Sequence, residues 1–221
     1  MERICGKHCL EMTTDELDEL IARLAERPDV LIDLGTGDGR FVLHTARAHP
    51  ARYVVGIDAC RDNLYEASRR APANALFLIA NICSMPAGLA GLASAITVNF
   101  PWGTLLAGLL EVGSPLLASL ARLARPGATL EIRLNGGALA EAGYSLAAGG
   151  ERVRRHVRLA GFHMAAPQPL AEDDLRAYPT TWAKRLAFGR DPRALYLAGR
   201  YCYHSEESEE RTNISWHAHS R

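Results

Sequence analysis

The residues best suited to chemistry stand in a short glycine-rich loop, "DLGTGDG", at positions 33–39. Glycine has no side chain and tolerates positive φ, so such a loop lets the backbone approach a ligand closely. The glycines are spaced G-x-G-x-G, whereas dinucleotide folds use G-x-G-x-x-G, and Asp33 and Asp38 add two carboxylates. Because two carboxylates repel a pyrophosphate, the loop favours a ligand with a cationic amine and a sulfonium.

Two later segments extend this interpretation to a ligand that contains adenosine. Asp58 ends the next predicted strand, where an acid can accept hydrogen bonds from both ribose hydroxyls. The segment "ANICSMP" at 80–86 follows the third predicted strand and is placed to meet the adenine edge. Together these features resemble the S-adenosylmethionine site of class I methyltransferases. The alternatives are tight turns in an unrelated α/β protein and a dinucleotide-dependent oxidoreductase; the glycine spacing and Asp38 argue against the latter.

A proline and a tryptophan stand at the end of the fourth predicted strand, in "FPWGT" at 100–104. With Asn99 they form a stretch that resembles the Asn/Asp-Pro-Pro-aromatic motif of enzymes that methylate exocyclic amines of bases, but the second proline is missing. This departure favours a ring nitrogen such as adenine N1, whose lone pair needs alignment but no general base. Trp102 is then a stacking platform worth about 1–3 kcal/mol per base. The alternative is that Trp102 packs in the core.

A second tryptophan, Trp182, opens a basic helix in "TTWAKRLAFGR" at 180–190. Two tryptophans can clamp a flipped base between them, because stacking offsets the cost of flipping. The basic residues of this helix would then hold phosphates on either side of the base. The alternative is an amphipathic surface helix whose tryptophan is buried and whose charges are solvated.

Alternating strand and helix patterns must position these residues. A first helix at 13–27 carries the capping-box pair Thr13 and Glu16, and the Gly- and Ala-rich segment 135–151 is expected to be a long, mobile excursion. The alternation predicts an α/β fold with a mostly parallel sheet that helices cover on both faces. The predicted strands are 30–35, 53–58, 75–80, 94–100, 128–134, 162–170 and 193–203, and the further helices are 39–49, 61–71, 104–124 with a break near 113–115, 152–161, 171–178 and 181–189.

The composition is that of an ordinary globular protein, with 48% hydrophobic and 23% charged residues in 221 positions. No apolar run reaches the roughly 20 residues of a membrane helix and the N-terminus lacks a signal-peptide pattern, so a cytoplasmic location is expected. The five cysteines form no disulfide framework, and Cys5, His8 and Cys9 are too few ligands to predict a metal site. The net charge is zero, but arginines gather at 152–158 and 184–193, and the acidic tail at 206–221 is expected to be disordered.

Three stretches, "DLGTGDGR", "FPWGTLL" and "WAKRLAFGR", together resemble the Kam-type aminoglycoside-resistance methyltransferases, which modify N1 of adenine 1408 in the decoding site of 16S rRNA. The resemblance covers about residues 3–203. It implies a class I, Rossmann-like methyltransferase with a seven-stranded, mostly parallel sheet and a single domain at 1–205. That domain would include an N-terminal hairpin and helix at 1–29 and a linker at 135–160 between the fifth and sixth strands.

The resemblance also implies roles for particular residues. Trp102 and Trp182 would sandwich the target adenine, and the protein would dock as a monomer on the 30S subunit near helix 44 of 16S rRNA. S-adenosylmethionine, which leaves as S-adenosylhomocysteine, would be bound by Asp33, Gly35, Thr36, Gly37, Asp58, Ala80, Asn81, Thr104 and Thr180. RNA would be contacted by Arg61, Arg69, Arg70, Arg152, Arg154, Arg155, Lys184, Arg185, Arg190 and Arg193.

The sequence departs from the family at a few places. A position in the adenine loop that is often acidic in relatives is Cys83, the linker is short, and the docking face has few lysines. A tRNA guanine-N7 methyltransferase shares the fold and a similar Pro-Trp stretch, but "FPWGTLL" lacks the Asp and the basic run that normally accompany it. A ribosome-binding relative that has lost turnover is a third alternative, although Asp33, Asp58 and both tryptophans are present.

Overall fold

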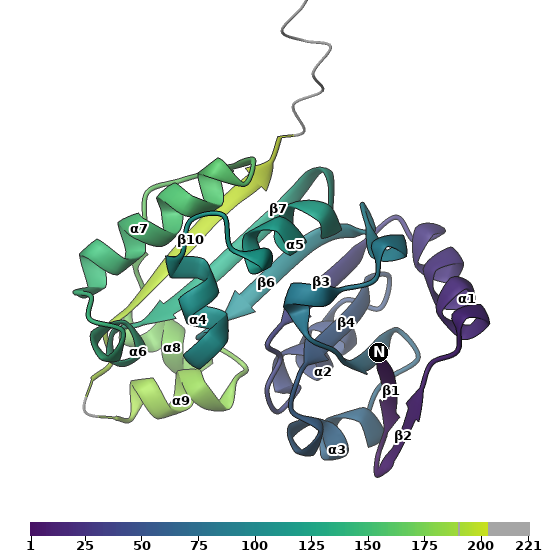
Figure 1. Ribbon diagram of the computed structural model, residues 1–221. Coiled ribbons are helices and arrows are strands. Elements are labelled where there is room, and N and C mark those ends of the chain that lie inside the picture. Colours follow the sequence, from purple (N-terminus) through teal and green to yellow (C-terminus); the bar gives the residue numbers. More distant parts are fainter. Residues whose placement is uncertain (190, 203–221) are drawn as a thin grey trace, which may run out of the picture.

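The computed structural model describes residues 1–189 and 191–202. In this part of the chain a ten-stranded sheet runs through the molecule, with helices on both of its faces (Figure 1). Two of the predictions, a phosphate contact at Arg190 and a disordered tail at 206–221, lie outside the described residues.

Five parallel strands form the centre of the sheet in the order β5-β4-β3-β6-β7. Nearly every residue of β3, β4 and β5 is buried, as expected for a parallel sheet that is covered on both faces. The chain moves outward from β3 in both directions, so the crevice outside the carboxyl ends of β3 and β6 is the place where such folds bind ligands. The five strands are β3 (Val30–Leu34), β4 (Tyr53–Asp58), β5 (Ala75–Ile79), β6 (Ala93–Asn99) and β7 (Ala124–Asn135).

Antiparallel strands complete the sheet at its two ends. On one side β10 pairs with β7, β8 and β9, and on the other the N-terminal hairpin β1-β2 pairs with β5. The predicted mostly parallel α/β sheet is therefore confirmed, but its strand count is higher because the hairpin joins the sheet and the predicted strand 162–170 is divided in two. These strands are β1 (Glu2–Cys5), β2 (His8–Glu11), β8 (Phe162–Met164), β9 (Gln168–Pro169) and β10 (Ala194–Tyr201).

The first five helices follow the sequence pattern. The capping box of Thr13 and Glu16 is present at the start of α1, and the helical segment after β6 breaks at Gly113, where Ser114 caps the next helix. Among the described residues no single helix is long and apolar enough to span a membrane; α4 and α5 together meet that composition but turn by 86° between them. These helices are α1 (Thr14–Ala25), α2 (Arg40–Ala48), α3 (Arg61–Arg69), α4 (Gly103–Leu110) and α5 (Pro115–Leu123), and two short 3-10 turns, η1 (Ile82–Ser84) and η2 (Ala87–Leu89), follow β5.

The prediction of a mobile excursion at 135–151 is wrong, because this segment forms α6 (Gly136–Glu141) and the start of α7 (Leu146–Leu159). Its glycines permit close packing: a Cβ at Gly149 would fall 2.5 Å from Leu139 Cδ2, and one at Gly150 would fall 2.5 Å from Leu195 Cδ1. The Gly-rich composition therefore reflects tight contacts between α7 and its neighbours, since the absence of a side chain serves packing as well as flexibility.

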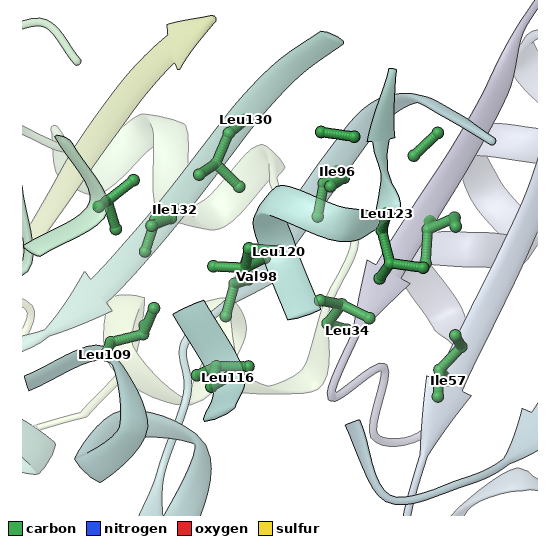
Figure 2. Close-up of a cluster of buried hydrophobic side chains, with 14 of the residues drawn as sticks. Leu34, Ile57, Ile96, Val98, Leu109, Leu116, Leu120, Leu123, Leu130 and Ile132 are labelled. Atoms are coloured by element: carbon green, nitrogen blue, oxygen red, sulfur yellow. The ribbon is translucent and has the colours of Figure 1, made fainter. Parts of the chain in front are cut away.

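The main core fills the space between one face of the sheet and the helices α4 and α5 (Figure 2). The strands contribute β-branched and leucine side chains, and the two helices contribute leucines, so the layers interdigitate. Full burial of each such side chain stabilises the fold by about 1.5–3 kcal/mol. This packing holds the carboxyl ends of the central strands in place. The residues labelled in Figure 2 are Leu34, Ile57, Ile96, Val98, Leu109, Leu116, Leu120, Leu123, Leu130 and Ile132.

Two short helices near the C-terminus, α8 (Glu172–Ala177) and α9 (Thr181–Ala187), lie at the carboxyl end of the central strands, where α9 meets the start of α4 (Figure 1). They enclose a small apolar cluster of their own around Phe100, with Leu175, Ala183 and Ala187. This cluster fixes α9 next to the "FPWGT" segment although the two are about 80 residues apart in the sequence.

Candidate functional site

The carboxyl ends of β3, β4, β5 and β6 open into one cavity of about 470 Å³. Every residue that the sequence assigned to the cofactor lines this cavity, and so do both tryptophans and Arg185. The lining also includes residues that the sequence analysis missed, among them Phe41 from α2 and Asn63 from α3. Their position in the first turn of the helix that follows each loop is the signal that would have identified them. The predicted cofactor residues on the lining are Asp33, Gly35, Thr36, Gly37, Asp58, Ala80, Asn81, Thr104 and Thr180.

The glycine loop has a shape that only glycine adopts readily. Gly35 and Gly37 have φ of 70° and 56°, in the left-handed region. A Cβ at Gly35 would lie 2.4 Å from Leu105 Cδ2, whereas one at Gly37 would meet nothing within 4 Å. Gly35 is therefore required both by its conformation and by its packing against Leu105. Gly37 is required by its conformation alone, because the space beside it is open.

Asp33 is a buried carboxylate at the end of β3, with 1% of its surface exposed. Burial raises its pKa to about 6, although hydrogen bonds to Oδ1 from Thr97 Oγ1 (2.6 Å) and Asn99 Nδ2 (2.9 Å) favour the ionised form. The hydroxyl of Thr36 is also buried here and has no hydrogen-bond partner among the described residues. A buried carboxylate and an unpaired hydroxyl on the cavity wall suit a cationic, hydrogen-bonding ligand.

Asp58 closes the glycine loop at the end of β4, a structural role that the sequence did not predict. Its Oδ2 accepts a hydrogen bond from the backbone N–H of Gly37 (2.8 Å), and its Oδ1 accepts one from Cys60 (2.8 Å). Each carboxylate oxygen keeps a second lone pair, so Asp58 can still accept hydrogen bonds from a ribose. Asp38, in contrast, contacts the hydroxyl of Thr181 and pairs with Arg40 (3.3 Å), so it holds the glycine loop to α9.

The loop after β5 forms the opposite wall of the cavity. The N–H of Ala80 donates to the carbonyl of Asp58 (3.1 Å), which joins this loop to the end of β4. Asn81 caps η1, because its Oδ1 accepts from the N–H of Cys83 (2.9 Å). The described residues hold no group of three or more His, Cys, Asp and Glu side chains placed to bind a metal ion.

The "FPWGT" segment leaves the sheet through a strained residue. Phe100 has φ of 52°, in the left-handed region, where a bulky residue costs of the order of 1–3 kcal/mol. Its N–H donates to the carbonyl of Arg133 (2.8 Å), and its side chain is buried in the α8–α9 cluster. This turn ends the ladder before Pro101, which therefore needs no N–H, and directs Trp102 into the cavity.

The two tryptophans lie against each other at the cavity. Their rings are stacked, with centroids 5.4 Å apart and planes at 18°, and each residue is 40% exposed. The alternatives in which either tryptophan is a core residue are therefore wrong. The guanidinium of Arg185 lies 5.2 Å from the centroid of the Trp182 ring, and Thr180 caps α9 by accepting from Ala183 (3.0 Å). The ring spacing leaves no room for a third ring, so a base can enter only if the rings separate.

The side-chain oxygen of Asn99 has both of its acceptor positions occupied. Its Oδ1 accepts hydrogen bonds from the hydroxyl of Tyr178 (2.7 Å) and from Arg133 Nη1 (3.2 Å), while its Nδ2 donates to Asp33. Because arginine can only donate and an ionised carboxylate can only accept, these partners define the orientation of the amide.

The arginines predicted to contact RNA fall into different environments. Lys184 and Arg185 are exposed on α9, and Arg61, Arg69 and Arg70 are exposed on α3, which lies on the same side of the molecule (Figure 1). Arg61 pairs with Glu2 (2.6 Å), Arg69 with Glu66 (2.8 Å) and Arg193 with Asp191 (2.7 Å). These pairs are largely exposed and contribute little, so they can exchange for phosphate contacts.

The arginines of α7 are not brought to the cavity. Arg152 Nε donates to the carbonyl of Leu110 (2.7 Å), and Arg154 pairs with Glu151 (3.1 Å). The helix continues past the exposed Arg155 toward the edge where β7 begins, because the strand after it pairs with the end of β10. The sequence could not show which end of α7 approaches the site.

A glycine loop after the first parallel strand, an acid at the end of the second and a tryptophan after the fourth, all around one cavity, define a class I S-adenosylmethionine-dependent methyltransferase. A family model described as NpmA, 16S rRNA (adenine(1408)-N(1))-methyltransferase, matches residues 2–200. The chain belongs to this family.

Individual relatives agree with the family match. A 16S rRNA (adenine(1408)-N(1))-methyltransferase of Escherichia coli is 30% identical over 220 residues, which are 90% of this chain and 98% of the relative. One from Streptoalloteichus hindustanus is 32% identical over 207 residues, 86% of this chain and 94% of the relative.

Solved structures of similar proteins have the same fold. The 16S rRNA methyltransferase KamB is 30% identical and superposes with a TM-score of 0.79 over 92% of this chain and 100% of that one. A tryptophan-to-alanine variant of the enzyme from Catenulisporales acidiphilia, solved with its cosubstrate SAM, is 28% identical with a TM-score of 0.75 over 91% of this chain and 97% of that one.

Proposed function

We propose that this chain methylates N1 of adenine 1408 in the decoding site of 16S rRNA and so confers aminoglycoside resistance. The observation that carries the proposal is the pair of stacked, half-exposed tryptophans, Trp102 and Trp182, on the wall of the cavity that also holds Asp33 and Asp58. Large rings exposed to solvent at this position have little to gain in a monomer, whereas they suit the flat face of a base.

The residues on the cavity wall fit S-adenosylmethionine. Asp33 and the unpaired Thr36 hydroxyl would hold the amino-acid end, and Asp58 would accept from the ribose hydroxyls. Ala80 and Asn81 would meet the adenine, while Thr104 and Thr180 line the remaining wall. When bound, the cofactor supplies an electrophilic methyl group on its sulfonium.

The acceptor is a ring nitrogen in this proposal because Asn99, which stands where related motifs grip an exocyclic amine, has no acceptor position left. Both acceptor positions of Asn99 Oδ1 are occupied by Tyr178 and Arg133. Adenine N1 needs no proton acceptor before it reacts, since its lone pair lies in the ring plane. The protein therefore has to align the base and exclude water, which is work for the two tryptophans.

The tryptophans would clamp a flipped adenine after their rings have separated. In the stacked arrangement each tryptophan ring covers one face of the other. A base that entered between them would replace this one ring–ring contact with two base–ring contacts. At about 1–3 kcal/mol for each base stacked on an aromatic ring, this exchange offsets much of the cost of flipping.

The partner in this proposal is the 30S subunit, contacted as a monomer near helix 44, and the location is the cytoplasm, where ribosomes are. The basic side chains of α3 and α9 are exposed on the same side of the molecule, and Arg185 lines the cavity itself, so they would hold rRNA phosphates around the flipped base. Arg193 and the exposed Arg155 would add contacts farther out, whereas Arg152 is held by the fold and is assigned none. The α3 and α9 residues are Arg61, Arg69, Arg70, Lys184 and Arg185.

Primer extension across 16S rRNA tests the proposal directly. Purified 30S subunits are incubated with the protein and S-adenosylmethionine, and reverse transcription should then stop at adenine 1408, because N1 methylation blocks Watson–Crick pairing. Reactions without cofactor and with Trp102→Ala provide the controls. Cofactor binding without a stop would overturn the assignment, and methylation of tRNA guanine in a parallel reaction would favour the tRNA enzyme instead.

A further inference from the structure

A row of polar side chains crosses the sheet from the cofactor cavity to the far side of β7. Thr97 on β6 stands opposite Asp33 on β3, and Asn99 stands opposite Arg133 on β7. Arg133 in turn stands opposite Tyr196 on β10. Because residues that are paired across neighbouring strands point to the same face, this register places the side chains within reach of one another.

We propose that Tyr178 and Arg133 are positioning residues for the cofactor: they hold the amide of Asn99 so that its Nδ2 donates to Asp33. Neither residue reaches the cavity through its own polar atoms in this arrangement; both act through Asn99. Without them the amide could rotate and present its oxygen to the carboxylate, which would repel it.

Tyr178 is itself held tightly, so its hydroxyl is a dependable donor. Its ring stacks on Phe41 with centroids 5.6 Å apart and meets Phe100 edge-on at 6.0 Å. Burial raises the pKa of the Tyr178 hydroxyl well above its usual range, so it stays protonated throughout the physiological range. The hydroxyl of Tyr178 therefore keeps the proton that it donates to Asn99 throughout this range.

Arg133 contacts two aromatic rings. Its guanidinium lies 4.2 Å from the centroid of Tyr178 and 4.9 Å from that of Tyr196, and Nη2 pairs with Glu131 (2.9 Å). Its side chain is only 13% exposed. The two ring contacts and the ion pair hold the guanidinium in place, and its contact with Asn99 is therefore directional.

The orientation of the Asn99 amide affects the charge of Asp33. Its pKa is about 6 because of burial, and the donation from Asn99 keeps it from rising further. The charged groups around it are Arg133 and Glu131 on β7, with Asp38, Asp58 and Arg185 on the same cavity. Since a cationic amine binds the ionised carboxylate, loss of the Asn99 hydrogen bond should weaken cofactor binding most where Asp33 begins to take up a proton.

Tyr178→Phe tests the proposal, because it removes the hydroxyl and leaves both ring contacts. The dissociation constant of S-adenosylmethionine is measured by calorimetry on the protein without RNA from pH 5.5 to 8.5. The expected result is a roughly five- to tenfold weaker affinity near pH 6.5, which corresponds to the loss of one hydrogen bond, and a pH midpoint of binding that moves upward. At pH 8.5 the difference in affinity between Tyr178→Phe and the wild type should be smaller.

Tyr196→Phe is the matched control. It removes the hydroxyl of the second ring that contacts Arg133 but none that bonds to Asn99, so its pH profile should follow the wild type. Asn99→Asp is the second variant: it keeps acceptors for Tyr178 and Arg133 but cannot donate to Asp33 when ionised, and it should weaken binding more than Tyr178→Phe. A Tyr178→Phe profile that coincides with the wild type, or that is weakened equally at every pH, would overturn the proposal. Because no RNA is present, this result does not depend on which base is methylated.

Discussion

Replacing Asp33 by Asn should make the protein without cofactor more stable while abolishing cofactor binding. The pKa of Asp33 is about 6, against 3.8 for an ordinary aspartate, so keeping it ionised at neutral pH costs about 3 kcal/mol. Asparagine has the same shape and can still accept the hydrogen bonds from Thr97 and Asn99 at its Oδ1. Its new N–H groups need acceptors, which reduces the gain, so we expect the free energy of unfolding to rise by about 1–3 kcal/mol at pH 7.5.

The pH dependence distinguishes this effect from general repacking. A carboxyl whose pKa is raised in the folded state stabilises the fold fully when the pH is below the pKa of that carboxyl in the unfolded chain. This contribution is lost as the pH rises through the folded-state pKa of about 6. The advantage of Asp33→Asn should therefore be about 1.4 kcal/mol smaller at pH 5 than at pH 7.5. Urea denaturation followed by circular dichroism at the two pH values measures this difference in the free energy of unfolding.

Asp29→Asn provides a control with the opposite sign. Asp29 pairs with Arg52 (2.8 Å), and hydrogen bonds from Arg52 and Ser94 outweigh partial burial, so its pKa is lowered. Its substitution should destabilise the protein slightly, by at most about 1 kcal/mol because the pair is partly exposed. This loss should be the same at pH 5 and at pH 7.5, because it shrinks only when the pH falls below 3.8, toward the lowered pKa of Asp29. Lower stability of Asp33→Asn at pH 7.5, or a difference that does not change with pH, would refute the reasoning about the buried carboxylate.

Three further predictions concern RNA and packing. Trp102→Ala and Trp182→Ala should each reduce methylation of 30S subunits by at least a hundredfold, through lost stacking and alignment, with the cofactor dissociation constant within about threefold of wild type by calorimetry; a variant that methylates normally would contradict the clamp. Arg185→Glu should weaken 30S binding and lower the slope of log affinity against log salt by at least one, as measured by filter binding at several salt concentrations, if its guanidinium meets a phosphate. Gly149→Val should lower the free energy of unfolding by about 2 kcal/mol or more in a urea titration, because the new side chain collides with Leu139; unchanged stability would show that α7 is loosely packed.

The sequence alone determined the order of the elements and the chemistry at the ends of the central strands. Apolar runs bounded by turn residues identified the parallel strands, and these patterns are local. Asp33 and Asp58 could be assigned to one site because parallel strands end at the same edge of their sheet, so two acids at two strand ends must lie close together. Gly35 and Gly37 could be read as a tight loop for the same local reason, which is their freedom of φ.

The tertiary structure decided what depends on contacts between distant segments. The sequence could propose two tryptophans as partners, but only the packing of Phe100 among the residues of α8 and α9 brings Trp182 to Trp102. Likewise, a glycine-rich sequence is compatible with a flexible loop and with closely packed helices. Only the neighbours of Gly149 show that α7 is tightly packed.

The network around Asn99 was also invisible in the sequence, because it is made by the register of β6 against β7 and by Tyr178 from a segment 79 residues away. Pairing across strands and burial are set by the whole fold, and burial is what raises the pKa of Asp33 above that of an ordinary aspartate. The sequence therefore names the acid at this site, and the fold determines its charge and its partners.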